Sequence, residues 1–279
     1  MATPSALRRL RSRAATLAAR LDPRLVTPPA ALWLSVRGRQ RCSVRYDDGL
    51  WVRRYADGTL VDMRLGGPTP RQQDAYVTDV YLYGYLPQPG DTVVDVGAGV
   101  GSEARLFSRL VGPQGRVFCV EADPTAARCL RRTVAENDLR NVVVVEAALS
   151  STRGSVQLEL DPDRYISNRL AHEGRSGIAV RALTFADLME EVGPGPVALL
   201  KMNIEGAEGE VLVPPPAELG RVEHVAVSCH DFKAGQPGSA WQATSTAVTA
   251  ALRSSGYELE SRPDDPRPWI RWYLYGARP

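Results

Sequence analysis

From residue 91 onward, short apolar runs alternate with segments in which apolar residues recur at helical spacing. Val93, Val94 and Val96 form the first run, and apolar residues three and four positions apart follow it in 102–111. Runs this short and rich in valine are typical of strands buried on both faces of a parallel sheet. The alternation therefore predicts a doubly wound, mostly parallel α/β sheet. The expected strands are 92–96, 116–121, 141–146, 154–160, 178–183, 197–203 and 222–229, with helices at 102–111, 124–137, 184–191, 205–212 and 240–255.

Two further segments flank this core in the sequence. Residues 71–86 predict a helix that carries several tyrosines. Tyr81 is our candidate among them to contact a cofactor or substrate, although tyrosines at this spacing are more often packing residues. Residues 257–260 and 269–275 are long enough to pair as an antiparallel hairpin at the edge of the sheet.

The first 70 residues follow a different pattern. Between 32 and 65, short alternating segments that begin with Leu32–Arg37 are separated by Asp-Gly turns, which are a strong hairpin signal. We predict a small antiparallel meander here, so that 1–70 is a helical and β extension and 71–279 is the main domain. Residues 1–21 place leucines among arginines. We expect a helix that packs on the protein, because its apolar face is narrow and has no aromatic anchor; contact with a membrane surface or a partner is the alternative.

Composition narrows the functional class. The chain has 279 residues, 44% hydrophobic and 24% charged, with a net charge of +2. This near-balance argues against a dedicated nucleic-acid binder. Its four cysteines have no metal-binding spacing, so we expect no metal site and a reducing, cytoplasmic setting. No apolar run approaches the roughly 20 residues of a membrane span, and no signal peptide is apparent, so no stable membrane insertion is expected.

The stretch Asp95-Val-Gly-Ala-Gly-Val-Gly101 carries the clearest chemical signal. It follows a predicted strand and precedes a predicted helix, a context in which glycines let the backbone approach a nucleotide-like ligand. Glu121, at the end of the next strand, is placed to accept the ribose hydroxyls. The spacing is one residue short of the dinucleotide fingerprint, since position 102 is serine. Together with the acidic Asp95, this favours S-adenosylmethionine over a nicotinamide cofactor.

Two polar clusters follow apolar strands and are candidates for the reacting end of the site. The segment Leu200–Glu208 brings Asn203 and Glu205 to the carboxyl end of a strand, where ligands of open α/β sheets bind. Glu208 fits equally well as an acid in the first turn of a helix. His230 follows the next strand and can act as a general base near neutral pH, with a rim histidine of no chemical role as the alternative.

These motifs resemble the FkbM family of class I methyltransferases over roughly residues 75–276. The segments that carry the resemblance are Asp95–Gly101, Val120–Pro124, Ala147–Ser150, Ala182–Leu188 and Leu200–Glu208. The resemblance implies a Rossmann-like, seven-stranded fold and S-adenosylmethionine-dependent O-methylation, often of hydroxyls on sugars or specialised metabolites. The family usually has aspartate where this chain has Asn203. Because an amide is neither an anionic base nor an equally strong ligand for a hard cation, a metal-assisted mechanism is disfavoured.

The resulting hypothesis is methyl transfer to a hydroxyl of a small molecule. His230 is the first candidate for the proton acceptor and Glu205 the second, and Asn203 completes the catalytic set. The cofactor would contact Asp95, Gly97, Ala98, Gly99, Glu121, Ala122, Glu146, Ala147 and Asn203, with Gly97–Gly99 at its amino-acid portion, Glu121 at the ribose and Glu146 and Ala147 at the adenine.

The substrate that accepts the methyl group is expected to contact the polar stretch 161–177, because long polar loops over a site usually set specificity. Tyr165, Asn168 and His172 are the candidates there, together with Tyr81. Two rival functions stay open, namely a non-enzymatic or catalytically weakened S-adenosylmethionine-binding protein and, less favoured, a nicotinamide oxidoreductase. The oligomeric state is also open, with a homodimer as one possibility.

Overall fold

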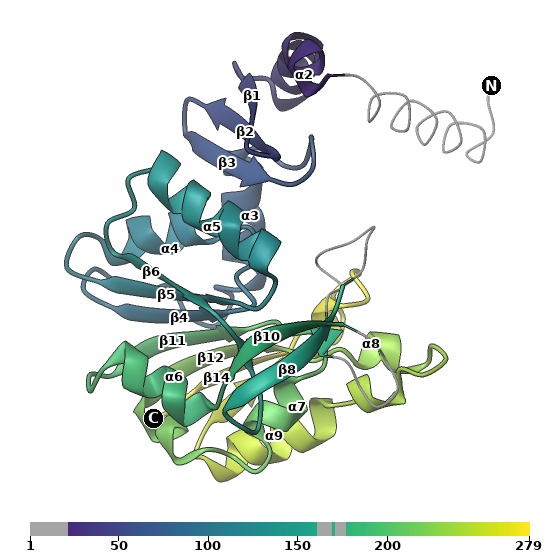
Figure 1. Cartoon of the computed structure of the whole chain (residues 1–279). Coiled ribbons are helices and arrows are strands. Elements are labelled where there is room, and N and C mark those ends of the chain that lie inside the picture. Colours follow the sequence, from purple (N-terminus) through teal and green to yellow (C-terminus); the bar gives the residue numbers. More distant parts are fainter. Residues whose placement is uncertain (1–21, 161–168, 171–176) are drawn as a thin grey trace. The chain divides into compact units, whose positions relative to one another are not determined.

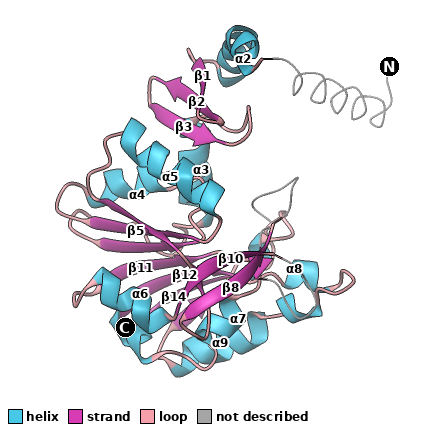
Figure 2. Cartoon of the chain, viewed as in Figure 1, coloured by secondary structure: helices cyan, strands magenta, loops and turns pink. Residues whose placement is uncertain are grey.

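A computed structural model describes residues 22–160, 169–170 and 177–279. Figures 1 and 2 show the chain by sequence position and by secondary structure. The chain divides into two units, the first reaching Arg71 and the second beginning at Gln72. We describe each unit by itself.

The first unit contains one helix and a small antiparallel sheet. Helix α2 spans Pro23–Gly38, and strands β1 (Ser43–Asp47), β2 (Leu50–Tyr55) and β3 (Gly58–Asp62) pair in the order β1-β2-β3. The first hairpin turns on Asp48 and Gly49, both with positive φ, as its two-residue Asp-Gly loop requires. The predicted meander is thus confirmed for 43–62.

The expected strand at 32–37 is wrong, because these residues belong to α2. The helix forms despite two internal prolines. Ala30 and Leu34, one helical turn apart, are buried, and Leu34 packs with Cys42 and Tyr55 of the neighbouring sheet. Burial at a four-residue interval therefore outweighs the two-residue alternation seen in the sequence.

The second unit is built on a seven-stranded sheet of order β13-β14-β12-β11-β4-β5-β6. All neighbours pair in parallel except β14, which is antiparallel to both β12 and β13. The strands are β4 (Thr92–Val96), β5 (Arg116–Glu121), β6 (Val142–Glu146), β11 (Val197–Met202), β12 (Val222–Ser228), β13 (Glu258–Glu260) and β14 (Tyr273–Ala277). The predicted seven-stranded, mostly parallel sheet and its terminal hairpin are confirmed. The strand order reverses at β4, where ligands of such sheets bind.

Helices cover both faces of this sheet (Figure 1). Alternate residues of β11 point to opposite faces: Leu199 joins one apolar cluster with α3, α4 and α5, and Leu200 joins another with α6, α7 and α9. This two-sided burial is what the valine-rich runs predicted. The α-helices of this part are α3 (Pro70–Val80), α4 (Ala104–Val111), α5 (Pro124–Glu136), α6 (Phe185–Val192), α7 (Glu208–Leu212), α8 (Asp231–Ala234) and α9 (Ser245–Ser254), and 3₁₀ turns lie at Ala217–Arg221, Ala240–Gln242 and Ile270–Trp272.

A second, four-stranded sheet lies beside the first. Its order is β7-β10-β8-β9, from Ala148–Leu149, Ile178–Leu183, Gly154–Glu159 and Arg169–Leu170 respectively. The strands expected at 154–160 and 178–183 exist, but they pair with each other rather than with the central sheet. The sequence gives no sign of this because both are short apolar segments of the same kind.

Several predicted helices are shorter than expected, and two of them differ most from their predicted bounds. The helix at 240–255 is a 3₁₀ turn followed by α9, because the Asp231 carboxylate accepts hydrogen bonds from the backbone N–H groups of Thr244 and Ser245 and from the Ser245 hydroxyl. This cap fixes the start of α9 at Ser245. The helix predicted at 71–86 ends at Val80. A network of polar contacts surrounds this end of the helix.

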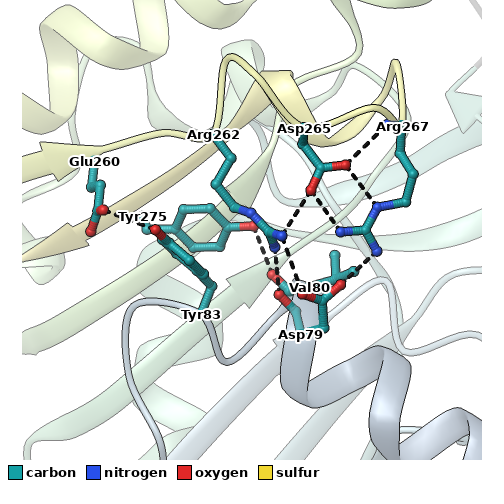
Figure 3. A network of polar contacts seen from close by, with 8 residues as sticks. All are labelled: Asp79, Val80, Tyr83, Glu260, Arg262, Asp265, Arg267 and Tyr275. Carbon is teal, nitrogen blue, oxygen red and sulfur yellow. Dashed lines mark hydrogen bonds and ion pairs between the residues drawn. The ribbon is translucent and has the colours of Figure 1, made fainter.

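This network ties the end of α3 to the segment before β14 (Figure 3). The carboxylate of Asp79 accepts hydrogen bonds from two arginines. Nη2 of Arg262 donates to Oδ1 at 3.2 Å, and Nη1 of Arg267 donates to Oδ2. Asp265 in turn pairs with Arg262 at 2.8 Å and binds Arg267 through both of its carboxylate oxygens. The hydrogen bond from Arg267 holds the pKa of Asp265 below its usual range.

Two tyrosines extend the same network. The hydroxyl of Tyr275 donates to the carbonyl of Val80 at 2.8 Å, and that of Tyr83 donates to Glu260 at 3.1 Å. These contacts hold the chain immediately around Tyr81, which is buried under the same turn.

Within the described residues, no helix is long and apolar enough to cross a bilayer.

Replacing the carboxylate of Asp79, which binds both arginines, should weaken the attachment of α3 to the segment before β14. We expect Asp79→Asn to lower the free energy of unfolding by about 1 kcal/mol, since networked exposed ion pairs contribute at this scale, with a melting temperature about 2–4 °C lower. Thermal unfolding followed by circular dichroism measures this. Asp264→Asn, an exposed residue outside the network, is the matched control and should leave the midpoint unchanged. Equal midpoints for the two variants would contradict the assigned role.

Candidate functional site

A cleft of about 920 Å³, counted to its open mouth, lies at the carboxyl ends of β4, β5 and β11. Val96 and the glycine loop form one side, and Asn203 and Glu205, which follow β11, form another. Ala148 and Leu158 of the small sheet supply an apolar wall. The cleft is therefore where the reversal of strand order predicts a ligand.

The glycine loop is folded tightly against its neighbours. Gly97 has φ +77°, and a Cβ there would lie 2.0 Å from the backbone oxygen of Asn203, so only glycine fits. The N–H groups of Gly97 and Ala98 donate to the carbonyl of Val120 at 2.9 and 3.0 Å. These two donors therefore fix the loop to β5 instead of pointing at a ligand.

Glu121 completes the attachment of the loop. Its carboxylate accepts the N–H of Gly99 at 2.7 Å on one oxygen and the N–H of Asp123 at 2.8 Å on the other. Burial raises its pKa to about 7, against the lowering effect of these two hydrogen bonds. Each carboxylate oxygen can accept a further hydrogen bond, and Glu121 lines the cleft.

A buried ion pair lies directly beneath the loop. Lys201 of β11 and Asp95 of β4 are 1% and 0% exposed, and Nζ lies 2.7 Å from Oδ1. Nζ also donates to the carbonyl of Gly97 at 2.8 Å and lies 4.9 Å from the centre of the Tyr81 ring. Burial acts to lower the pKa of Lys201, but the neighbouring carboxylates of Asp95 and Glu103 outweigh this effect. The pKa is therefore raised above its usual value, and the ammonium stays charged. Asp95 itself is not part of the cleft lining.

Glu103 presents a second carboxylate at this end of the cleft. Its two oxygens accept hydrogen bonds from Gln73 Nε2 at 3.0 Å and from Ser102 Oγ at 2.9 Å. Burial raises the pKa of Glu103, while the ammonium of Lys201 lowers it. Sequence reasoning missed both Glu103 and Lys201. The available signals were a lysine inside an apolar strand and an acid immediately after the glycine loop.

At the other end, His230 lies between two carboxylates. Its Nδ1 is 3.0 Å from Oε1 of Glu208 and its Nε2 is 3.4 Å from Oε1 of Glu205. The first contact is an ion pair that is not aligned as a hydrogen bond. The ring is 2% exposed. Burial alone would lower the pKa of His230, but Glu208 and Glu205 raise it to about 9, so the ring is an imidazolium at neutral pH.

Glu205 occupies the position between this cluster and the cleft. It adopts φ +58°, in the left-handed region, and its backbone carbonyl accepts a hydrogen bond from Gln242 Nε2 at 2.9 Å. Burial acts to raise the pKa of Glu205, but its contacts with His230 and Lys233 lower it. Glu205 lines the cleft, whereas His230 and Lys233 do not. It is therefore an ionised carboxylate facing the ligand space.

Comparison with known proteins identifies this arrangement. The family model described as the methyltransferase FkbM domain matches residues 95–259, more than half of the chain. The chain belongs to the FkbM methyltransferase family. The resemblance drawn from the sequence motifs is thereby confirmed, and S-adenosylmethionine is the cofactor of this methyltransferase.

Individual relatives match this FkbM-family chain over shorter stretches. A protein-L-isoaspartate O-methyltransferase of Aeropyrum pernix is 46% identical over 59 residues, 21% of this chain and 23% of that protein. A probable cobalt-precorrin-6B C(15)-methyltransferase of Sulfolobus acidocaldarius is 36% identical over 72 residues, 26% of this chain and 38% of that protein. The matched stretches thus span well under half the length of these relatives.

The chain is also similar to solved structures at low sequence identity. The O-methyltransferase TomG of Streptomyces achromogenes superposes with a TM-score of 0.47 at 12% identity, covering 78% of this chain and 82% of that one. Methyltransferase FkbM of Methylobacillus flagellatus superposes with a TM-score of 0.40 at 16% identity, covering 73% of this chain and 50% of that one.

The residues of the methyltransferase fit a cofactor of this kind. The glycine loop lines the cleft, and the cleft combines apolar walls with the carboxylates of Glu103 and Glu121. Of the predicted cofactor residues, seven line the cleft: Gly97, Ala98, Gly99, Glu121, Ala122, Ala147 and Asn203.

Two of the predicted cofactor residues do not line the cleft. Asp95 lies beneath the loop, paired with Lys201. Glu146 is outside the lining, and its carboxylate lies 2.6 Å from Nη1 of Arg131. Arg131 belongs to α5, and the sequence pattern did not predict this ion pair.

The predicted substrate and catalytic residues fall into three groups. Tyr81 and Asn203 both line the cleft, and burial raises the pKa of Tyr81 well above its usual value. Tyr165, Asn168 and His172 lie outside the described residues. An imidazolium cannot accept a proton, so the raised pKa of His230 counts against the first candidate for the proton acceptor. The second candidate, Glu205, lines the cleft.

Removing one partner of the buried pair should be costly. We expect Lys201→Met to lower the free energy of unfolding by about 3–5 kcal/mol, because it leaves Asp95 as an uncompensated buried charge. Chemical denaturation of the purified protein measures this. The double variant Lys201→Met with Asp95→Leu removes both charges and should recover most of the loss. A single variant as stable as wild type would refute the buried pair.

The His230 cluster predicts a dependence of stability on pH. The pKa of His230 is raised from 6.5 to about 9 on folding, so its contribution is complete below pH 6.5 and disappears as the pH rises through 9. We expect His230→Gln to be less stable than wild type by about 1–3 kcal/mol at the acidic end, with the difference shrinking across that window. Denaturation at several pH values tests this. His224→Gln, outside the cluster, should show no such convergence.

Proposed function

We propose that this protein is an S-adenosylmethionine-dependent O-methyltransferase that methylates a hydroxyl of a small molecule, such as a specialised metabolite or a sugar. The observation that carries the proposal is the ionised carboxylate of Glu205 in the lining of a cleft that the glycine loop also lines. Methylation of a hydroxyl needs an acceptor for its proton, and a carboxylate supplies one. The matched relatives include carbon as well as oxygen methyltransferases, so the choice of oxygen rests on Glu205.

The cofactor would be held by residues on three sides. Gly97–Gly99 would border its amino-acid portion and Glu121 its ribose. Ala147, with the apolar wall around Leu158, would border its adenine. Glu121 supports the ribose assignment because both oxygens keep free acceptor capacity while backbone donors fix their position.

Glu103 is the proposed partner of the cofactor's ammonium group. Glu103 lines the cleft beside the glycine loop. The ammonium of Lys201 faces two carboxylates there, those of Glu103 and Asp95. This leaves an excess of negative charge when Glu103 is ionised. A cationic amino group would restore the balance and draw the pKa of Glu103 back down.

When bound, the cofactor supplies a methyl group activated on a sulfonium, so the protein contributes alignment and proton transfer. The neutral hydroxyl of Tyr81 and the amide of Asn203 can orient an acceptor hydroxyl. Glu205 would take its proton. His230 and Lys233 act as positioning residues, since both hold the Glu205 carboxylate.

The alternative is a non-enzymatic or weakened S-adenosylmethionine-binding protein. Asn203, which replaces an aspartate usual in the family, favours it. Such a protein would bind the cofactor and methylate nothing. A nicotinamide oxidoreductase is not supported, because the family match and the loop spacing both point to a methyl donor.

The ammonium assignment is tested by cofactor binding. We expect Glu103→Gln to weaken S-adenosylhomocysteine binding by about 10- to 100-fold, the scale of a hydrogen bond to a charged group, with little change for 5′-methylthioadenosine, which lacks the amino-acid portion. Isothermal titration calorimetry measures both. Glu258→Gln, an exposed residue on β13, is the control. Equal losses for both ligands would place Glu103 elsewhere in the site, and no binding of either ligand to wild type would overturn the proposed function.

The acceptor role is tested by turnover. Incubation with S-adenosylmethionine and a panel of hydroxylated small molecules should give a product heavier by one methyl group, detected by mass spectrometry. With that acceptor, we expect Glu205→Gln to slow turnover by about 10²–10⁴-fold while leaving S-adenosylhomocysteine affinity unchanged. Unchanged turnover would exclude Glu205 as the proton acceptor. Cofactor binding without product from any acceptor would favour the non-enzymatic alternative.

A further inference from the structure

Positive charge is concentrated at the start of the chain. Residues 1–41 contain nine arginines and one aspartate, a net charge of +8, whereas the whole chain carries +2, so residues 42–279 carry −6. Within the described part of this stretch, Arg37, Arg39 and Arg41 are all exposed. The first unit therefore presents a basic surface on a protein that is otherwise acidic.

Helix α2 carries an apolar face that the described residues of the first unit do not cover. Leu25, Leu32, Trp33 and Val36 are 69%, 68%, 52% and 71% exposed. At about 100° per residue, Leu25, Leu32 and Val36 lie within about 20° of one line along the helix. The residues that pack on the small sheet, such as Leu34, lie on the opposite side. Four large apolar side chains on one exposed face exceed the scattered exposure normal for a soluble surface.

We propose that this face of α2, comprising Leu25, Leu32, Trp33 and Val36, binds the surface of an anionic lipid membrane. An apolar face with an aromatic residue, flanked by arginines, is the pattern of a helix that lies in the membrane interface. Arg37 sits 5.2 Å over the Trp33 ring, so a cation and an interface-preferring aromatic occur together. Arginines near the surface would be attracted by anionic headgroups.

The charge distinguishes this occupant from others. A second copy of the chain would bring two basic surfaces together, which like-charge repulsion disfavours. A nucleic acid would pair with the arginines but leave the apolar face exposed to water. The absence of a spanning helix among the described residues fits attachment at the surface. This proposal is independent of the proposed catalytic function.

Vesicle co-sedimentation of the full-length protein tests the proposal. We expect binding to vesicles of phosphatidylcholine mixed with phosphatidylglycerol, weak binding to phosphatidylcholine alone, and loss of binding as salt screens the headgroups. The variant Leu32→Ser/Trp33→Ser/Val36→Ser should bind anionic vesicles at least about tenfold more weakly, because it removes the side chains that would enter the interface. Leu86→Ser, a leucine 48% exposed in the second unit, is the matched control and should bind as wild type.

Several outcomes would overturn the proposal. Wild type that stays in the supernatant at every lipid composition, or a triple variant that binds as tightly as wild type, contradicts it directly. A wild-type dimer that the triple variant loses, measured by analytical ultracentrifugation, would identify a second copy as the occupant. Vesicle binding that the triple variant keeps but that removal of residues 1–21 abolishes would assign the binding to that segment instead. S-adenosylhomocysteine affinity of the triple variant should match wild type, which verifies that the second unit is folded.

Discussion

The ion pair between Lys201 and Asp95 is the interaction on which the site depends. The two residues are register partners on β11 and β4, the adjacent central strands where the sheet order reverses. Through Nζ, Lys201 also holds the carbonyl of Gly97. One buried cation thus joins the pairing of the two strands to the conformation of the loop that follows one of them. A buried pair adds little stability over a well-packed apolar one, so we interpret it as a device for holding the loop.

The balance of positive and negative charge differs between the two ends of the cleft. At the loop end, one ammonium faces the carboxylates of Asp95 and Glu103. At the other end, Glu205 and Glu208 are matched by His230 and Lys233. A cationic ligand group is therefore favoured beside the loop, while the balanced end can hold a neutral acceptor. This asymmetry suits a cofactor whose charged amino-acid portion must lie away from the acceptor.

The local pattern of the sequence was enough to predict much of the fold. The valine-rich runs predicted β5 at 116–121 with its observed bounds, because strands buried on both faces need an unbroken apolar sequence. The Asp-Gly pairs likewise predicted the meander. The helix at 23–38 was missed because its buried face is defined only by packing against that meander. Strand membership in the small sheet was missed for a similar reason, since pairing partners far apart in the chain leave no local pattern.

The site was predictable in its backbone and less so in its charges. Glycine spacing located the loop, yet the residues that fix its charge, Lys201 and Glu103, are recognisable only once β11 is placed beside β4. The histidine shows the same limit: its type suggested a base, but the carboxylates around it convert it to a cation. Which protonation state a side chain adopts depends on neighbours that tertiary structure supplies.

The substitution at position 203 can be interpreted in the same terms. The backbone of Asn203 does two things that any residue could do: its N–H donates to the carbonyl of Val96 at 3.0 Å, and its carbonyl lies against Gly97. An aspartate here would keep both contacts and add a charge beside Glu205. With an amide instead, the acceptor end retains Glu205 as its ionised group facing the cleft, supported by two cations behind it. The change therefore removes a charge from the site while preserving the loop geometry, and in the proposed mechanism it leaves the proton-accepting role to one carboxylate.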